Sequence, residues 1–289
     1  MTCEGPGPPN RVYIYSTDDV SKAVTVIRTK PAKSLHVQRS VKMEIKSVVI
    51  GGIKFYVKFY KPTNFDARKK YRVVFNVYGG PTKNKVTTKY QAAYAYYFAG
   101  HYQNVVVMLD ARGTPGRSDN FHHAIYKKLG DVDVTDTIAI IKRIRREPWV
   151  KATRMAIYGA SYGGYQILHI LQREPKLFRA AVAAASVTDW AMYDSAYTER
   201  FMGLYDKEVY TRASLLPGAN NTPNNVLLLI HGLSDYNVLI RHHWALVSEL
   251  NRHHVRYKHY VKPGQAHKIK RLLHTLLWFR ERIWRRRRC

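Results

Sequence analysis

Polar and apolar residues alternate along two neighbouring segments, 44–50 and 53–60, and Gly51 and Gly52 lie between them. Alternation with a period of two, interrupted by a glycine pair, is typical of a β-hairpin. Further strands are expected at 71–78, 104–110, 155–158, 226–230 and 256–261. The segment 104–110 is apolar almost throughout, which is typical of a strand buried on both faces of a parallel sheet.

A different spacing occurs between these strands. In the segment 134–146, Ile138, Ile141 and Ile144 recur every third residue and therefore lie on one face of an amphipathic helix. Further helices are expected at 165–171, 241–251 and 269–283. Alternating strands and helices predict an α/β fold with a doubly wound, mostly parallel sheet. Because residues 1–40 show no clear period, we expect the folded domain to occupy residues 41–289.

The length and composition fit one large α/β domain. The chain has 289 residues, of which 46% are hydrophobic, enough to cover a substantial core. No segment approaches the roughly 18 apolar residues of a membrane span, and the first five residues do not resemble a signal peptide. Two cysteines, Cys3 and Cys289, form no disulfide framework. The sequence predicts neither a metal site nor a cofactor, and it leaves the cellular compartment open.

The formal net charge of +28 raises the question of a nucleic acid partner. Apart from the clusters at 268–271 and 285–288, the basic residues are scattered over expected helix faces and loops. The sequence has no zinc-ligand spacing, no RNA-recognition signature and no basic region with heptads. We therefore expect no specific nucleic acid partner, and we interpret the terminal arginines as a solvated tail. Nonspecific binding of polyanions at low salt would follow from charge alone.

Ser161 lies at the centre of the motif Gly-Ala-Ser-Tyr-Gly, between an expected strand and an expected helix. This motif in this context predicts a nucleophile elbow, a strained turn that exposes the serine hydroxyl at the end of a sheet. The glycines at 159 and 163 lie where strand and helix nearly touch, so a Cβ there would block the turn. The alternative is an ordinary glycine-rich turn.

Partners for a serine nucleophile follow in the order Ser, Asp, His that this elbow requires. Asp235 lies just past the expected strand 226–230, and His267 lies in a loop between a strand and the last helix. The ends of parallel strands share one edge of a sheet, where His267 can take the proton of Ser161 while Asp235 orients the imidazole. His231 lies at a strand end beside a glycine and is expected to pack.

Five ordered blocks resemble the catalytic domain of the prolyl oligopeptidase family. They are Tyr-Gly-Gly-Pro at 78–81, Asp-Ala-Arg-Gly at 110–113, the elbow at 159–165, Trp190 with 193–203, and His-Gly with Asp-Tyr-Asn-Val at 231–238. The segment 197–203 is similar to the dipeptidyl-peptidase IV branch, which includes fibroblast activation protein. The resemblance implies an α/β-hydrolase fold and a serine peptidase that cleaves after proline or alanine near the amino terminus of peptides.

The resemblance also implies roles for further residues. The backbone N–H of Tyr162 and the hydroxyl of Tyr78 would bind the oxyanion, although Tyr78 could instead pack at a strand end. Asn237 would bind the substrate carbonyl one residue upstream. A small apolar pocket for proline would be lined by Tyr162, Val187, Trp190, Tyr193, Tyr197 and Val238. Trp190, Tyr193 and Tyr197 recur at spacings of three and four, as on one face of a helix, so they could equally form plain core.

The chain departs from the family pattern at several points. Ala160 stands where the family usually has Trp, and Ala180 stands where the branch commonly has a cysteine, so that bridge cannot form. The resemblance implies that residues 1–40 are a short β-propeller remnant and linker. The glutamate pair that holds the substrate's free amine lies in the family's propeller, so we expect this part of the site to be absent here.

The sequence leaves open two other functions and the possibility of a homodimer. A noncatalytic homologue could act as an interaction protein, but intact Ser161, Asp235 and His267 argue against it. A generic α/β-hydrolase esterase would not explain residues 193–203. The resemblance implies a homodimer through the C-terminal helix, where Leu272, Leu276, Phe279 and Ile283 form an apolar stripe. We expect a weak dimer at most, because the nearby arginines repel one another, and the stripe could instead pack on the sheet.

Overall fold

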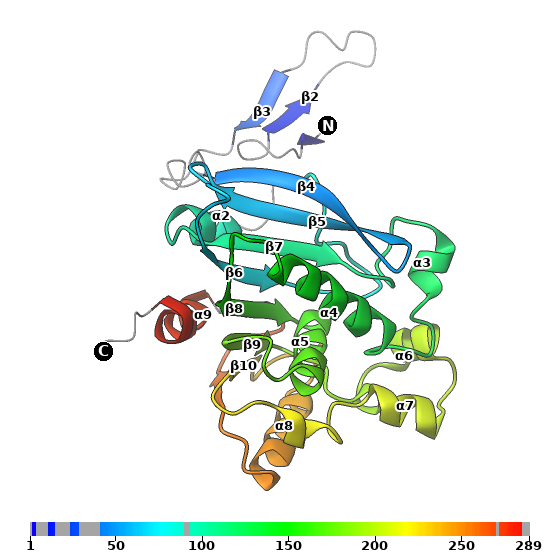
Figure 1. The fold of residues 1–289 in the computed structure, drawn as a ribbon. Coiled ribbons are helices and arrows are strands. Elements are labelled where there is room, and N and C mark those ends of the chain that lie inside the picture. Colours follow the sequence, from blue (N-terminus) through cyan, green and yellow to red (C-terminus); the bar gives the residue numbers. More distant parts are fainter. Residues whose placement is uncertain are drawn as a thin grey trace, which may run out of the picture.

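A computed structural model shows an eight-stranded sheet with helices on both faces (Figure 1). The structure describes residues 2–3, 11–14, 24–28, 41–89, 93–269 and 272–284. Within the N-terminal part, three short strands pair antiparallel: β1 (Thr2–Cys3), β2 (Arg11–Ile14) and β3 (Val24–Arg28). Most of the predicted propeller remnant lies outside the described residues, so this assignment and the domain boundary at residue 40 stay predictions.

The large sheet has the strand order β11-β10-β9-β8-β6-β7-β5-β4. Six strands, β11 to β7 in this order, run parallel, and the β4–β5 hairpin adds to β7 antiparallel. The strands are β4 (Val41–Ile50), β5 (Ile53–Pro62), β6 (Tyr71–Asn76), β7 (Val105–Asp110), β8 (Val150–Ala160), β9 (Ala180–Ala184), β10 (Leu227–Gly232) and β11 (Lys258–Lys262). The predicted hairpin is confirmed, with Ile50 opposite Ile53 across the turn.

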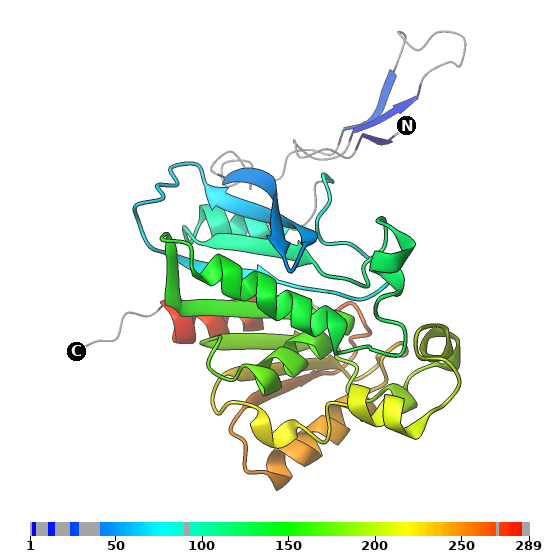
Figure 2. The ribbon, with the colours of Figure 1, turned by 45° about the vertical axis from the view of Figure 1, so that its right-hand side comes forward.

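Two apolar clusters, one on each face of the sheet, form the core. The larger cluster contains residues of α4 (Val132–Arg145), α5 (Tyr162–Arg173) and α8 (Arg241–Arg252); the smaller contains residues of α2 (Ala93–Gly100) and α9 (Leu272–Phe279). Shorter helices, α3 (Asp119–His123), α6 (Ser195–Met202) and α7 (Lys207–Ala213), gather along one side of the molecule (Figure 2). This arrangement is the predicted α/β-hydrolase fold.

The C-terminal helix packs on the sheet. Phe279 and Ile283 are fully buried in the smaller cluster, and the indole N–H of Trp278 donates to the Val226 carbonyl at 3.2 Å. Helix α9 continues as a π-helical turn at Arg280–Trp284. These two stripe residues therefore contact the rest of the chain rather than a second copy, and the weak dimer itself stays a prediction. None of the described helices is long and apolar enough to cross a membrane.

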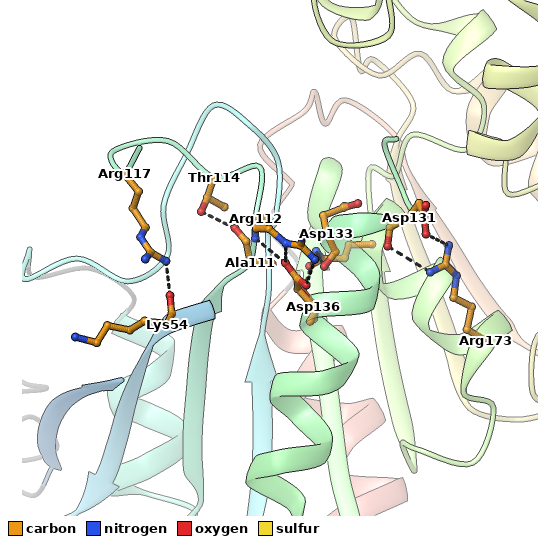
Figure 3. Close-up of polar contacts among 11 residues, drawn as sticks. Lys54, Ala111, Arg112, Thr114, Arg117, Asp131, Asp133, Asp136 and Arg173 are labelled. Carbon is orange, nitrogen blue, oxygen red and sulfur yellow. Dashed lines mark hydrogen bonds and ion pairs between the residues drawn. The ribbon is translucent and has the colours of Figure 1, made fainter. Parts of the chain in front are cut away.

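The Asp-Ala-Arg-Gly block at the end of β7 fastens two neighbouring segments. The Arg112 guanidinium forms two hydrogen bonds of 2.7 Å with the Asp136 carboxylate on α4 (Figure 3). The Asp110 carboxylate accepts from the backbone N–H groups of Lys85 and Val86 at 2.8 and 2.9 Å. A bidentate pair of this kind fixes orientation as well as distance, so the block ties α4 and the loop after β6 to the same sheet edge.

Candidate active site

Ser161 lies between β8 and α5 in a conformation that side chains rarely adopt. Its backbone has φ 59° and ψ −125°, and its N–H donates to the Ala184 carbonyl on the neighbouring strand at 2.8 Å. A non-glycine residue held at such dihedral angles stores strain, which persists only where the surroundings fix it. The predicted strand–turn–helix context of the motif is therefore present.

Close backbone contacts explain the glycines at 159 and 163 on either side of Ser161. A Cβ at Gly159 would lie 2.7 Å from the Val77 carbonyl oxygen, and one at Gly163 would lie 2.4 Å from the same atom. Both distances are far inside van der Waals contact with backbone, which cannot move aside as a side chain can. Glycine is thus required at both positions for β6, β8 and α5 to approach each other this closely.

Asp235 and His267 form the acid–base half of the site. His267 Nδ1 lies 2.8 Å from Asp235 Oδ2, and the other carboxylate oxygen accepts from the N–H groups of Asn237 and Val238, each at 3.0 Å. Asp235 is buried, whereas the His267 side chain is 26% exposed. With Nδ1–H donated to the carboxylate, the second ring nitrogen of His267 is left to accept a proton.

The charge of Asp235 follows from its partners. Burial alone would raise its pKa, but the His267 hydrogen bond and the two backbone donors outweigh burial, so the pKa is lowered. Asp235 is therefore a carboxylate at neutral pH. It can stabilise an imidazolium on His267.

The sheet topology brings the three predicted residues to one edge. Strands β8, β10 and β11 are parallel members of the sheet, and β9 lies between β8 and β10. Ser161 directly follows β8, Asp235 follows β10, and His267 follows β11. Carboxyl ends of parallel strands meet at a common edge, where α/β proteins place their ligands.

His231 packs as predicted and also makes a polar contact that the sequence did not reveal. It is buried at the end of β10, and its Nε2 lies 2.8 Å from the Val238 carbonyl oxygen and 3.5 Å from Asp235 Oδ2. Burial lowers the pKa of this imidazole. A carbonyl oxygen can only accept, so Nε2 of the neutral ring must carry the hydrogen. His231 thus holds the 235–238 loop by its backbone.

Tyr78 and Tyr162 lie beside each other, with ring centroids 6.1 Å apart. A Cβ at Gly80 would lie 2.7 Å from the Tyr162 ring and 2.9 Å from the Tyr78 ring, so Gly80 permits this approach. The Tyr78 hydroxyl lies 3.2 Å from the Thr82 hydroxyl, and burial raises the pKa of Tyr78, which keeps it a protonated donor. The oxyanion roles of the Tyr78 hydroxyl and the Tyr162 N–H stay predictions.

The side chain of Tyr162 points into the core rather than into an open pocket. It is buried, and its hydroxyl donates to Asp133 Oδ2 at 3.0 Å. Asp133, on the first turn of α4, is also fully buried, and burial raises its pKa to about 7 despite this hydrogen bond. Asp133 was not among the predicted site residues, because 29 positions separate it from Tyr162. Nothing in the local sequence reveals the contact.

The aromatic residues meet, but not on one helix as their spacing predicted. Trp190 lies in a 3₁₀ turn, Trp190–Met192, which begins after Asp189. Tyr197 lies on α6, which begins after Asp194. Each aspartate accepts a backbone N–H, at Ala191 and Tyr197 respectively, so the segment breaks into two short helices. The single-helix prediction is therefore wrong.

The three rings nevertheless form one cluster. Trp190 and Tyr197 are stacked with centroids 5.6 Å apart, and Tyr193 is edge-on to both, at 5.7 and 5.4 Å. The Tyr193 hydroxyl donates to Asn237 Oδ1 at 3.0 Å, which connects the cluster to the Asp235 loop. Val187 and Val238 are buried in the same core cluster as Trp190. Tyr193, through Asn237, and Val238, through its N–H, thus connect the cluster to the Asp235 loop, and the predicted pocket itself stays a prediction.

The described residues contain no group of three or more His, Cys, Asp or Glu that could hold a metal ion.

Two positions at which the chain departs from the family pattern are alanines in the structure. Ala160, where the family usually has Trp, places a small, half-buried side chain directly before Ser161. Ala180 is fully buried in β9.

Known proteins resemble this chain over most of its length. The model of the prolyl oligopeptidase family matches residues 83–283. Prolyl endopeptidase FAP of Mus musculus is 35% identical over 242 residues, covering 82% of this chain and 32% of that protein. Dipeptidyl peptidase 4 of Sus scrofa is 33% identical over 244 residues, with the same two coverages.

A solved structure shows the same architecture. Dipeptidyl peptidase 4 of Porphyromonas gingivalis superposes with a TM-score of 0.86 at 28% sequence identity, covering 97% of this chain and 41% of that chain. The chain spans about a third of the length of the two curated relatives. The five sequence blocks predicted this likeness.

Proposed function

Since the chain belongs to the prolyl oligopeptidase family, in its dipeptidyl peptidase 4 and FAP branch, we propose that it is a serine peptidase. It would cleave after proline or alanine near the amino terminus of peptides, through an acyl-enzyme on Ser161. One observation carries the proposal: the 2.8 Å contact of His267 with a buried, charged Asp235, on the sheet edge that also holds the strained Ser161.

The geometry supports a complete acyl-transfer cycle. His267 Nε2 takes the proton of the Ser161 hydroxyl as its oxygen attacks the scissile carbonyl carbon, and Asp235 stabilises the resulting imidazolium. The oxyanion accepts from the Tyr162 N–H and the Tyr78 hydroxyl. His267 then gives the proton to the leaving amine as the C–N bond breaks. Water attacks the acyl-enzyme with His267 again as base, which releases the acid and restores Ser161.

The aromatic cluster supports the preference for proline. Tyr193 and Tyr197, which are only partly buried and pack on the buried Trp190, offer flat apolar surfaces, which suit a pyrrolidine ring. Proline has no N–H, so it leaves no donor unpaired in such surroundings. Asn237, held by Tyr193, keeps its amide N–H₂ group to donate to the substrate carbonyl one residue upstream.

Active-site labelling tests the nucleophile. A fluorophosphonate probe is expected to add one covalent label to Ser161, detected by mass spectrometry of the peptide, and Ser161→Ala should abolish it. Ser195→Ala, at an exposed serine at the start of α6, is the matched control and should label fully. Equal labelling of the Ser161→Ala variant would place the nucleophile elsewhere. No labelling of the wild-type chain would favour a noncatalytic interaction protein.

Substrate comparison tests the cleavage preference. Hydrolysis of a Gly-Pro amide is expected to exceed that of a Gly-Val amide by at least tenfold, since a β-branched residue with an N–H does not suit the cluster. Efficient hydrolysis of simple esters with no such preference would support the generic esterase. Comparison with the same Gly-Pro amide acetylated at its amine shows whether cleavage requires a free amino terminus. A preference for the free amine supports dipeptidyl cleavage, and indifference supports cleavage after proline without regard to the amino terminus.

A further inference from the structure

A basic cavity lies away from the candidate active site. It has a volume of about 560 Å³ and is formed by the loop before α4, the last turn of α5 and helix α7. Its lining consists of four basic residues, one acid and three apolar residues: Lys127, Lys128, Arg173, Arg212, Asp131, Leu129, Val209 and Ala213. Three separate segments of the chain therefore bring cations to one hollow.

The positive charge in this cavity is only partly compensated. Of the described residues that line the cavity, Asp131 is the only one with a carboxylate, and it lies 3.8 Å from Arg173 with its side chain 65% exposed. Among the residues that the structure describes, no carboxylate lies within 4.0 Å of Lys127, Lys128 or Arg212. Four cations against one acid leave a local excess of positive charge, which attracts an anion.

Arg173 is held in place largely by neutral acceptors. Its guanidinium donates to the carbonyl oxygens of Gly130 at 2.7 Å and Asp131 at 3.4 Å, and to the Thr135 hydroxyl at 3.2 Å. Figure 3 shows Arg173 beside Asp131. Carbonyl and hydroxyl groups orient the guanidinium without cancelling its charge. An oriented arginine loses little conformational freedom when it binds a phosphate.

The size of the cavity and the residues that line it limit which class of ligand can bind there. A single phosphate would leave most of 560 Å³ empty and would meet only part of the cation set. Leu129, Val209 and Ala213 are buried and lower the local dielectric, which strengthens charge pairing at the cavity. We propose that this cavity binds a small molecule with two or more phosphate groups.

The cavity is connected to the aromatic cluster. Ala213, in its wall, has a carbonyl oxygen that accepts from the Tyr165 hydroxyl at 2.8 Å, and the Tyr165 ring is edge-on to Trp190 at 5.1 Å. On the other side, the Lys127 N–H donates to the Phe201 carbonyl of α6 at 2.9 Å. An anion that draws Lys128 and Arg212 together therefore ties α7 to the loop before α4. The loop before α4 contacts the helix that carries Tyr197, and α7 contacts Tyr165, which packs on Trp190.

Calorimetry with inorganic tripolyphosphate tests the site. The Ser161→Ala chain is used, so that the result does not depend on peptidase activity, in a buffer of physiological ionic strength. We expect saturable binding of one tripolyphosphate per chain. The double variant Lys128→Glu/Arg212→Glu should weaken binding at least tenfold. The control Lys70→Glu/Lys151→Glu changes the net charge equally at two exposed lysines outside the cavity and should change the affinity less than threefold.

Several results of this experiment would overturn the proposal. Equal weakening by both double variants would overturn the proposal, because binding would then depend on net charge alone, and so would the absence of saturable binding. Inorganic phosphate should bind at least tenfold more weakly than tripolyphosphate; equal affinity would overturn the assignment to several phosphate groups. Adenosine triphosphate as a second ligand distinguishes the sources. Tighter binding than tripolyphosphate would indicate a phosphorylated metabolite with a ring on the apolar wall, and weaker binding would indicate a purely inorganic chain.

Discussion

Two buried aspartates, Asp235 after β10 and Asp133 at the start of α4, both support the candidate active site, yet they carry opposite pKa shifts. Asp235 accepts two backbone N–H groups and the His267 imidazole, and these partners lower its pKa against the effect of burial. In Asp133 full burial raises the pKa to about 7, although the neutral hydroxyl of Tyr162 and nearby backbone N–H groups favour the charged form.

In Asp133 burial outweighs the hydrogen bonds that favour the charged form, whereas in Asp235 the His267 imidazole and the two backbone donors outweigh burial. In the proposed mechanism Asp235 faces a ring that becomes a cation, so a fixed negative charge is useful there. Asp133 faces a neutral hydroxyl and needs only to accept a hydrogen bond. We therefore expect the negative charge of Asp235 to be needed and Asp133 to be needed only as a hydrogen-bond acceptor. Substitutions at Asp235 and at Asp133 test this difference, and substitutions at His231 test the loop that carries Asp235.

The largest effect is expected from Asp235→Asn. The asparagine can turn its amide N–H₂ toward His267 Nδ1, which would favour the tautomer that carries its hydrogen on Nε2, and this nitrogen could then not take the proton of Ser161. By analogy with other triads, kcat/KM for a Gly-Pro amide should fall by about 10⁴-fold. Circular dichroism should show an unchanged fold, since Asn237 and Val238 can still donate to the remaining oxygen. A loss below tenfold would mean that the charge of Asp235 is not used.

A smaller effect is expected from His231, which holds the same loop from inside. His231→Ala removes the donor to the Val238 carbonyl and leaves that buried oxygen unsatisfied, which costs about 1–3 kcal/mol. We expect the loop to shift in order to satisfy this oxygen, which displaces Asp235 and Asn237. kcat/KM should then fall about tenfold or more, and KM should rise because Asn237 lies on the loop.

His231→Gln is the matched control for this variant. Its amide N–H₂ can reach the same carbonyl oxygen, so it should restore most of the lost kcat/KM. An effect on thermal stability alone, with KM and kcat unchanged, would show that His231 packs without positioning the loop.

Strand-end positions explain why the acid–base residues could be predicted from sequence. Ser161, Asp235 and His267 each follow a segment whose apolar pattern is strong, and parallel strands bring such ends to one edge. The contacts of His231 with Val238 and of Tyr162 with Asp133 could not be predicted, because they depend on how loops and helices pack. The predicted helix through Trp190, Tyr193 and Tyr197 failed because two capping aspartates outweighed the hydrophobic period.

Sequence patterns were also weakest at the two ends of the chain. The apolar stripe of the last helix had the spacing of either a dimer interface or a core face, and periodicity cannot distinguish these. The structure buries Phe279 and Ile283 against the sheet. Residues 1–40 gave no period, and their assignment depended on resemblance alone.

The smallest effect on catalysis is expected from Asp133→Asn, which keeps an acceptor for the Tyr162 hydroxyl but removes the titrating group. We expect kcat/KM to change less than about threefold, well under 1.4 kcal/mol. The pH dependence of stability should change instead. The ordinary pKa of 3.8 is raised to about 7 in the folded chain, so between these values the unfolded chain loses a proton that the folded chain keeps.

In that window the free energy of unfolding of the wild type should therefore fall as pH rises, by up to about 1.4 kcal/mol per pH unit from this group. The contribution is fully present below pH 3.8 and is lost as pH passes through about 7. Urea unfolding of wild type and Asp133→Asn at pH 4.5, 5.5, 6.5 and 7.5 gives the difference between the two chains, which cancels the other titrating groups. The difference should decline steadily to pH 7 and then level off. A constant difference across the series would mean that Asp133 is as charged in the folded chain as Asp235, and the division between the two aspartates would fail.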